Sequence, residues 1–222
     1  MLKDLIHKLG SLVSDRGTVD PSRFNDPLAL TVAWTPNRRG GANFCTHRLA
    51  QINPERLEFR ATASMSLFCV VFIVIGLVVA IAIPAAQWFR GVWTFQPSLL
   101  APLLVGALFA VIGTGMLFSS RKPIVFDKRG GFYWKGRSSP QESFNPSAVK
   151  ECAELKTIHA LQIISERCSS KNGSYYSYEL NLVLGDGRRI TAVDHGSYPK
   201  LREDAEKLSS FLGKPLWDAI EQ

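Results

Sequence analysis

Two long runs of apolar residues dominate the hydropathy pattern of the chain. They span residues 65–83 and 98–118, and neither contains Lys, Arg, Asp, Glu or His. Each run reaches the roughly 20 residues that an α-helix needs to cross about 30 Å of hydrocarbon. In a helix the backbone N–H and C=O groups form hydrogen bonds with each other, and lipid offers them no other partner. The pattern therefore predicts a membrane hairpin of two transmembrane helices, in preference to a buried hairpin of a soluble core.

Before the first run, short apolar stretches alternate with polar ones. Residues 1–14 place apolar side chains at helical spacing, which predicts an amphipathic helix that either lies on lipid or docks on protein. Residues 15–64 predict a cytoplasmic linker and short β-strands at 28–34, 43–52 and 56–61, with a breaker-rich turn at 36–42. We interpret this turn as a hairpin tip that faces anionic lipid.

Residues 119–222, after the second run, predict a cytoplasmic α+β domain. An amphipathic helix with an apolar stripe from Leu201 to Leu212 ends at Gly213 and closes the domain. Antiparallel strands closed by one helix resemble the plan of pleckstrin-homology (PH)-like domains, a strongly bent sheet or partial barrel. We expect the N-terminal strands to pack against or extend this sheet. The predicted strands lie at 124–126, 132–134, 148–155, 158–166, 178–184 and 188–193.

Positive charge gathers beside the two runs. The formal net charge is +7, and Arg90 is the only charged residue of the connection 84–97. Because cytoplasmic flanks carry the excess of Lys and Arg, both termini are expected in the cytoplasm and 84–97 forms a short external loop. We expect anionic-lipid contacts from the basic side chains Arg38, Arg39, Arg121, Lys122, Lys128 and Arg129, and interfacial anchoring from the aromatic side chains Trp88, Phe89, Trp93 and Phe95.

The same charge distribution argues against a nucleic-acid partner. Residues 138–222 carry ten basic and twelve acidic side chains, so the distal region is slightly acidic. The basic excess next to the membrane is explained more simply by the lipid bilayer.

Inside the predicted spans, the informative residues are small ones. No ionisable side chain of the kind that marks ion or proton pathways is present, which argues against a transporter. Small residues four positions apart allow close helix contact, either between the two spans or with a further copy or membrane subunit. The predicted packing residues are Gly76, Ala80, Gly106, Ala110, Gly113 and Thr114.

No chemical motif accompanies the four histidines. Cys45 and His47 lie on one face of a predicted strand, but structural zinc needs four ligands and catalytic zinc three. Asp194 and His195 with Ser197 or Ser165 lack a nucleophile motif, and a turn capped by Asp194 is the commoner arrangement. The sequence therefore predicts a non-enzymatic protein without catalytic residues, cofactor or metal.

Several short stretches carry a resemblance that covers most of the chain from about residue 24. With them the chain resembles uncharacterised proteobacterial proteins with two spans and a cytoplasmic β-rich domain. The resemblance implies the bacterial inner (cytoplasmic) membrane and no chemistry. The stretches are NDPLAL (25–30), WTP (34–36), GGANF (40–44) with Thr46 and His47, LEF (57–59), FDK (126–128) and FLGKPLW (211–217).

Three function classes remain open at this point. The leading hypothesis is an inner-membrane adaptor or accessory subunit whose cytoplasmic β domain binds a membrane or cytoplasmic protein at the membrane surface, with a homo-oligomer as a further arrangement. The alternatives are an immunity-type protein against a membrane-acting toxin and a lipid- or phosphate-sensing module. The last would require Arg38, Arg39, Lys128 and Arg129 to converge on one face.

Overall fold

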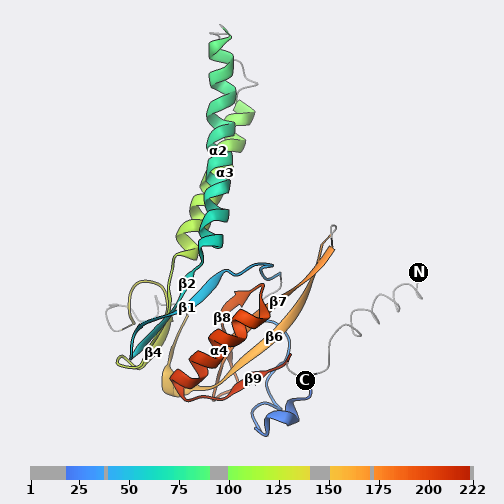
Figure 1. Ribbon diagram of the computed structural model, residues 1–222, viewed down its shortest axis with the longest axis vertical. Helices are drawn as coiled ribbons and strands as arrows, with labels where there is room; N and C mark the ends of the chain where they lie inside the picture. The colour runs from blue at the N-terminus through green and yellow to red at the C-terminus, as the bar shows by residue number, and fades with distance from the viewer. Residues whose placement is uncertain (1–18, 38–39, 91–99, 141–150, 171–172, 221–222) are drawn as a thin grey trace, which may run out of the picture.

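A pair of long apolar helices stands on a β-rich module in the computed structural model (Figure 1). The structure describes residues 19–37, 40–90, 100–140, 151–170 and 173–220. The helices are α2 (Ala63–Phe89) and α3 (Leu100–Ser120), and both are long and apolar enough to cross a membrane. Most of their surface is exposed, as expected of helices that face lipid. The predicted amphipathic helix at 1–14 lies outside the described residues.

α2 begins directly after a strand and continues beyond the predicted span. Thr62 caps the helix: its hydroxyl accepts a hydrogen bond from the Met65 N–H (3.2 Å) and donates one to the Cys45 carbonyl (2.6 Å). The helix then continues through Pro84 to Phe89. The first part of the expected external loop is therefore helical, since neighbouring helix atoms and local adjustment tolerate proline in such helices.

Glycines bring α2 and α3 into close contact. A Cβ atom on Gly76 would lie 2.6 Å from the Ala110 nitrogen and from the Gly106 carbonyl oxygen. A Cβ on Gly106 would lie 2.6 Å from the Ala80 nitrogen. Phe72 and Phe109 stack beside this contact, with ring centroids 5.7 Å apart. The small residues of the two spans thus serve the packing of one helix on the other.

The strands next to the helices form a five-stranded antiparallel sheet, here called sheet A. Its order is β1-β2-β3-β4-β5, so β2 and β3 are hydrogen-bonded neighbours although both helices separate them in sequence. This pairing confirms that the N-terminal strands extend the C-terminal sheet. The strands are β1 (His47–Asn53), β2 (Arg56–Ala61), β3 (Ile124–Asp127), β4 (Phe132–Lys135) and β5 (Cys152–Glu154).

Four further strands form a second sheet, sheet B, in the order β8-β7-β6-β9. The first three are antiparallel neighbours, whereas the short β9, which follows the C-terminal helix α4 (Tyr198–Leu212), pairs parallel to β6 and was not expected from the sequence. A three-residue helix, η4 (Leu155–Thr157), joins the two sheets. The strands are β6 (Ile158–Ser170), β7 (Gly173–Leu184), β8 (Arg189–His195) and β9 (Leu216–Asp218).

One hydrophobic core lies between the two sheets and α4. Alternate residues of each strand face it, and the helix adds its apolar stripe. The module is therefore an α+β fold with two sheets and a C-terminal helix, and among the described strands no pairing closes a barrel. Large side chains in this core include Phe59, Phe126 and Tyr133 from sheet A, Leu161 and Leu182 from sheet B, and Leu201 and Leu208 from α4.

The N-terminal segment covers the outer face of sheet B, and here one prediction is wrong. Residues 28–34 form a turn, not a strand: Asp26 accepts a hydrogen bond from the Leu28 N–H (2.9 Å), and Leu28 in turn accepts one from Val32 (3.1 Å). The apolar side chains of this turn pack on Trp217 and the outer residues of β6 and β7, after the short 3-10 helix η1 (Pro21–Phe24). Apolar residues here therefore indicated burial against the sheet, not a strand.

The described part of the expected hairpin tip at 36–42 also lies on sheet B. Asn37 donates its backbone N–H to Glu179 (3.0 Å) and its side-chain amide to Asn181 and Thr191 (both 3.3 Å). The Gly40 N–H bonds to Glu166 (3.1 Å). Since no strand precedes this segment, the predicted hairpin is absent from this part of the described chain. Residues 38–39 lie outside it.

Candidate functional site

A groove lies at the end of the module away from the helices. We call it the distal groove. Its volume is about 580 Å³, and its lining residues come from the β3–β4 turn, the end of β5 and the end of α4. Its floor is apolar and three lysines stand around it. The lining residues are Lys128, Gly130, Gly131, Phe132, Glu154, Leu155, Lys156, Leu212 and Lys214.

Lys128 enters the groove from a tightly held turn. Its backbone N–H donates to the Glu55 carbonyl of the β1–β2 turn (2.8 Å), while Asp127 accepts bonds from the N–H groups of Gly130 and Gly131. The Lys128 ammonium lies over the Phe211 ring, 4.5 Å from its centroid. A cation over an aromatic face is stabilised by the ring quadrupole. The turn therefore fixes this charge at the edge of the groove.

The other two lysines come from the ends of η4 and α4. Lys156 forms an ion pair with Glu154 (2.6 Å), which raises the pKa of Lys156, and its side chain is 81% exposed. Lys214 follows the last turn of α4, where its N–H and carbonyl both bond to Ser209. Glu154 thus stabilises the charged form of Lys156.

A second, smaller groove of about 370 Å³ continues the first and shares Lys156 and Lys214 with it. Arg188 and Asp186 of the β7–β8 turn stand at its far side. Its His159 donates a hydrogen bond from Nε2 to the Asp26 carboxylate (2.7 Å). Burial raises the pKa of Asp26, but this bond and those from the backbone lower it overall. With histidine taken as neutral, the two grooves together carry four basic and two acidic side chains, a positive surface.

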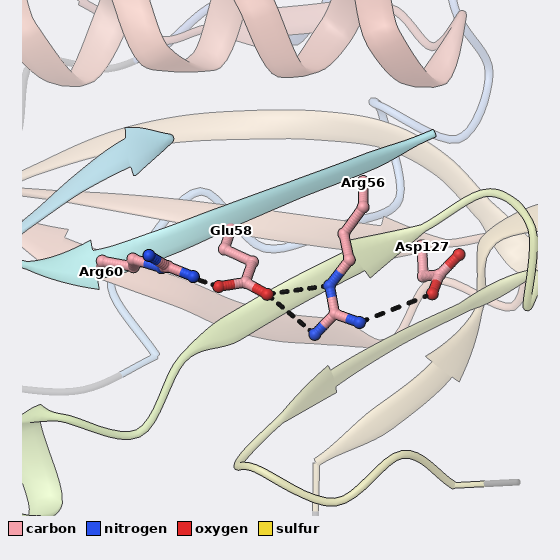
Figure 2. Close-up of polar contacts among 4 residues, drawn as sticks. All are labelled: Arg56, Glu58, Arg60 and Asp127. Carbon is pink, nitrogen blue, oxygen red and sulfur yellow. Dashed lines mark hydrogen bonds and ion pairs between the residues drawn. The ribbon is translucent and has the colours of Figure 1, made fainter. Parts of the chain in front are cut away.

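A charged cluster marks the outer face of sheet A, nearer the helices (Figure 2). Glu58 of β2 is buried, and its carboxylate accepts hydrogen bonds of 2.8 Å from Arg56 and from Arg60, the residues two positions before and after it. Arg56 also lies 3.9 Å from Asp127 and over the Trp134 ring. The buried carboxylate thus orients two guanidinium groups along the strand.

The structure separates the basic residues predicted to contact lipid. Arg121 and Lys122 are exposed and follow α3 directly, where a membrane surface would lie. Lys128 and Arg129 lie in the turn after β3, at the opposite end of that strand from α3. Lys128 contacts Phe211 of α4, and Arg38 and Arg39 lie outside the described residues.

The other predicted site residues fall into described and undescribed groups. Trp88 and Phe89 are exposed at the end of α2, 57% and 87% respectively, while Trp93 and Phe95 lie outside the described residues. In the helix pair, the structure brings together Gly76, Ala80, Gly106 and Ala110, and Gly113 packs against Ile73. Thr114 also lies on α3.

Asp194 and His195, the candidate chemical groups, are hydrogen-bonded within the module. Asp194 accepts a hydrogen bond from Ser177 (2.5 Å), and His195 bonds to the backbone of Ser197 (3.0 Å). Burial raises the pKa of Asp194 and lowers that of His195, so each favours its neutral form more than in water. Across the described residues, no group of three or more His, Cys, Asp or Glu side chains is arranged to hold a metal ion.

Sequence reasoning missed the distal groove, because its lysines come from three distant segments that each read as ordinary turn charge. It also missed Glu58, although the alternation of Arg56, Glu58 and Arg60 places all three on one face of a strand. Comparisons with models of known protein families, with curated proteins and with solved structures gave no match to this chain.

Proposed function

We propose that this protein is a non-enzymatic adaptor or accessory subunit of the bacterial inner membrane whose cytoplasmic module binds a protein partner through the distal groove. Both chain termini lie on the cytoplasmic side in this arrangement. The observation that carries the proposal is the place of the groove: its lining residues belong to turns and element ends that lie at the end of the module opposite to α2 and α3. A soluble segment of another protein can reach it there without competing with lipid.

The chemistry of the groove favours a protein segment that combines apolar and acidic side chains. Phe132, Leu155 and Leu212 provide an apolar floor, and Lys128, Lys156 and Lys214 stand around it. Apolar contact gives binding energy in such sites, while complementary charge at the rim raises the association rate and selects the partner.

The connection between helices and sheet supports an adaptor role. β2 ends at Ala61 and α2 begins at Ala63, while α3 ends at Ser120 and β3 begins at Ile124. Since β2 and β3 are also hydrogen-bonded to each other, the helix pair has no flexible linker to the module. A partner bound in the groove is therefore held at a fixed distance and orientation from the bilayer.

We further propose that the module is PH-like, with two sheets packed on one core and a C-terminal helix across them. The shared core of sheet A, sheet B and α4 supports this reading. PH-like folds occur with many functions, so the ligand must be inferred from the residues of the site and not from the fold.

The test is co-purification with charge-reversed variants of the full chain. Wild-type protein, the groove variant K156E/K214E and the control K200E/K207E are solubilised in mild detergent, and bound proteins are quantified by mass spectrometry. The control changes the net charge equally on exposed positions of α4, outside the groove. A protein retained by wild type and control, but reduced at least tenfold with the groove variant, is the expected result.

Two outcomes contradict the proposal. If all three proteins retain a partner equally, its binding surface lies outside the distal groove. If the wild-type protein purifies alone, it has no stable partner. The proposed orientation is tested separately: green fluorescent protein fused after Gln222 is expected to fluoresce, whereas alkaline phosphatase at the same position is expected to be inactive.

A further inference from the structure

A pair of arginines stands face to face on sheet A just below the helices. Arg48 of β1 and Arg60 of β2 are direct partners across the antiparallel ladder, and both are exposed. Side chains of such partners leave Cβ atoms about 5 Å apart on one face of the sheet, and like charges there repel each other. The pair carries two positive charges against the single carboxylate of Glu58, which Arg60 shares with Arg56, and an anion between the two guanidinium groups makes the arrangement more favourable.

Glu58 prepares one half of this pair for an anion. Its buried carboxylate bonds to the Nε atom of Arg60 at 2.8 Å (Figure 2). The bond to Nε holds the guanidinium plane, and the Arg60 side chain remains 56% exposed. An arginine fixed in this way loses less conformational entropy when it binds a phosphate oxygen with its terminal N–H groups.

The pair lies at the level of lipid headgroups. Arg60 precedes Thr62, the residue that caps α2, and the uncharged run begins at Met65. Two extended residues and one helical turn cover about 11 Å, and arginine side chains extend several ångströms toward an interface. Because Ile124 pairs with Phe59, the exposed Arg121 and Lys122 at the end of α3 lie beside the same end of β2.

From these observations we infer that Arg48 and Arg60 form a binding site for the phosphate group of an anionic phospholipid headgroup. Arg121 and Lys122 add positive charge around the site. The inference is independent of the protein partner proposed above, because the distal groove lies at the other end of β3. A lipid headgroup and a free anion can both present a phosphate group to the site. The hydrocarbon next to the site favours the lipid.

The experiment measures lipid binding to the full chain in dodecyl maltoside by native mass spectrometry. Dioctanoyl phosphatidylglycerol is titrated against wild type, R48A/R60A and the control R188A/K207A, which removes two exposed basic side chains that are not among the predicted lipid contacts. We expect R48A/R60A to bind phosphatidylglycerol about tenfold more weakly, as the loss of charge-assisted hydrogen bonds implies. The control is expected to bind like the wild type, and dioctanoyl phosphatidylcholine to bind weakly to all three.

The remaining outcomes contradict either the proposed binding site or the proposed ligand. Equal binding by wild type and R48A/R60A, or an equal loss in the control, overturns the site. If inorganic phosphate stabilises the wild type as strongly as phosphatidylglycerol does, the ligand of the site is a free anion, and the assignment to lipid is overturned. If circular dichroism shows that R48A/R60A is unfolded, the single variant R48A is read instead, with an expected weakening of about threefold.

Discussion

Replacing Glu58 with glutamine tests how the charged cluster on sheet A contributes to stability. Glutamine keeps the size of the side chain and removes its charge. In the native protein, the Glu58 side chain is only 5% exposed and pairs with Arg56 and Arg60 at 2.8 Å. After the substitution, an amide faces the two guanidinium groups, and Arg56 keeps Asp127 at 3.9 Å whereas Arg60 loses its carboxylate partner.

The magnitude follows from how much water each arginine keeps. Breaking a fully buried ion pair costs about 3–5 kcal/mol. The side chains of Arg56 and Arg60 are 32% and 56% exposed, so water replaces part of the lost interaction. The amide oxygen also still accepts one hydrogen bond. We therefore expect Glu58→Gln to lower the free energy of unfolding by about 1–3 kcal/mol, a fall in Tm of roughly 3–10 °C for a module of this size.

Arg60→Ala is the matched comparison, because the exposed partner of a pair is worth less than the buried one. Its expected cost is below about 1 kcal/mol. Thermal unfolding in dodecyl maltoside, followed by tryptophan fluorescence, reports on the cluster directly, since Trp134 lies under the Arg56 guanidinium. An Arg60→Ala variant as unstable as Glu58→Gln, or a Glu58→Gln variant with unchanged Tm, would refute this reasoning.

Three further predictions concern pH and close backbone contacts. Burial, with Lys135 and His195 nearby, lowers the pKa of His47 from 6.5 to about 4. As the pH falls, the unfolded chain therefore binds a proton at this site before the folded protein does. Stability is constant above pH 6.5 and falls by about 2–4 kcal/mol toward pH 4. In pH-dependent melts, His47→Gln is expected to flatten this profile. In sodium dodecyl sulfate titrations, Gly106→Val is expected to lower the stability of the helix pair by at least about 2 kcal/mol, because its Cβ overlaps α2. Gly115 faces open space, so the control Gly115→Val is expected to change this stability by less than about 1 kcal/mol. Gly196→Ala overlaps the backbone of Asn43 and Phe44 and is expected to speed proteolysis of residues 24–46, which Gly185→Ala leaves unchanged.

Periodicity was sufficient to predict most of the elements. The two uncharged runs became α2 and α3, and the stripe from Leu201 to Leu212 became the buried face of α4. It failed at 28–34, where the apolar residues are buried against a sheet without joining its ladder. It also failed for β9, since three residues are too few to show alternation.

Sites assembled from distant segments lay beyond this reasoning. The pairing of β2 with β3 was predictable, because the two ends of a helical hairpin emerge side by side. The distal groove was not, because nothing in the local sequence of Lys128, Lys156 or Lys214 indicates that α4 ends beside the β3–β4 turn. Proximity across elements is decided by core packing, which the pattern of one chain does not encode locally.

The insertion of the helix pair between two bonded strands links the two proposed sites. Arg48 and Arg60 lie at the end of sheet A where the chain enters and leaves the helices, and Lys128 lies in the turn at the other end of β3. A strand of four residues covers about 13 Å, so β3 holds the groove at a set height above the lipid contact. Lipid bound at Arg48 and Arg60 would add a contact at the sheet itself to the two short chain connections that already orient the groove relative to the helices.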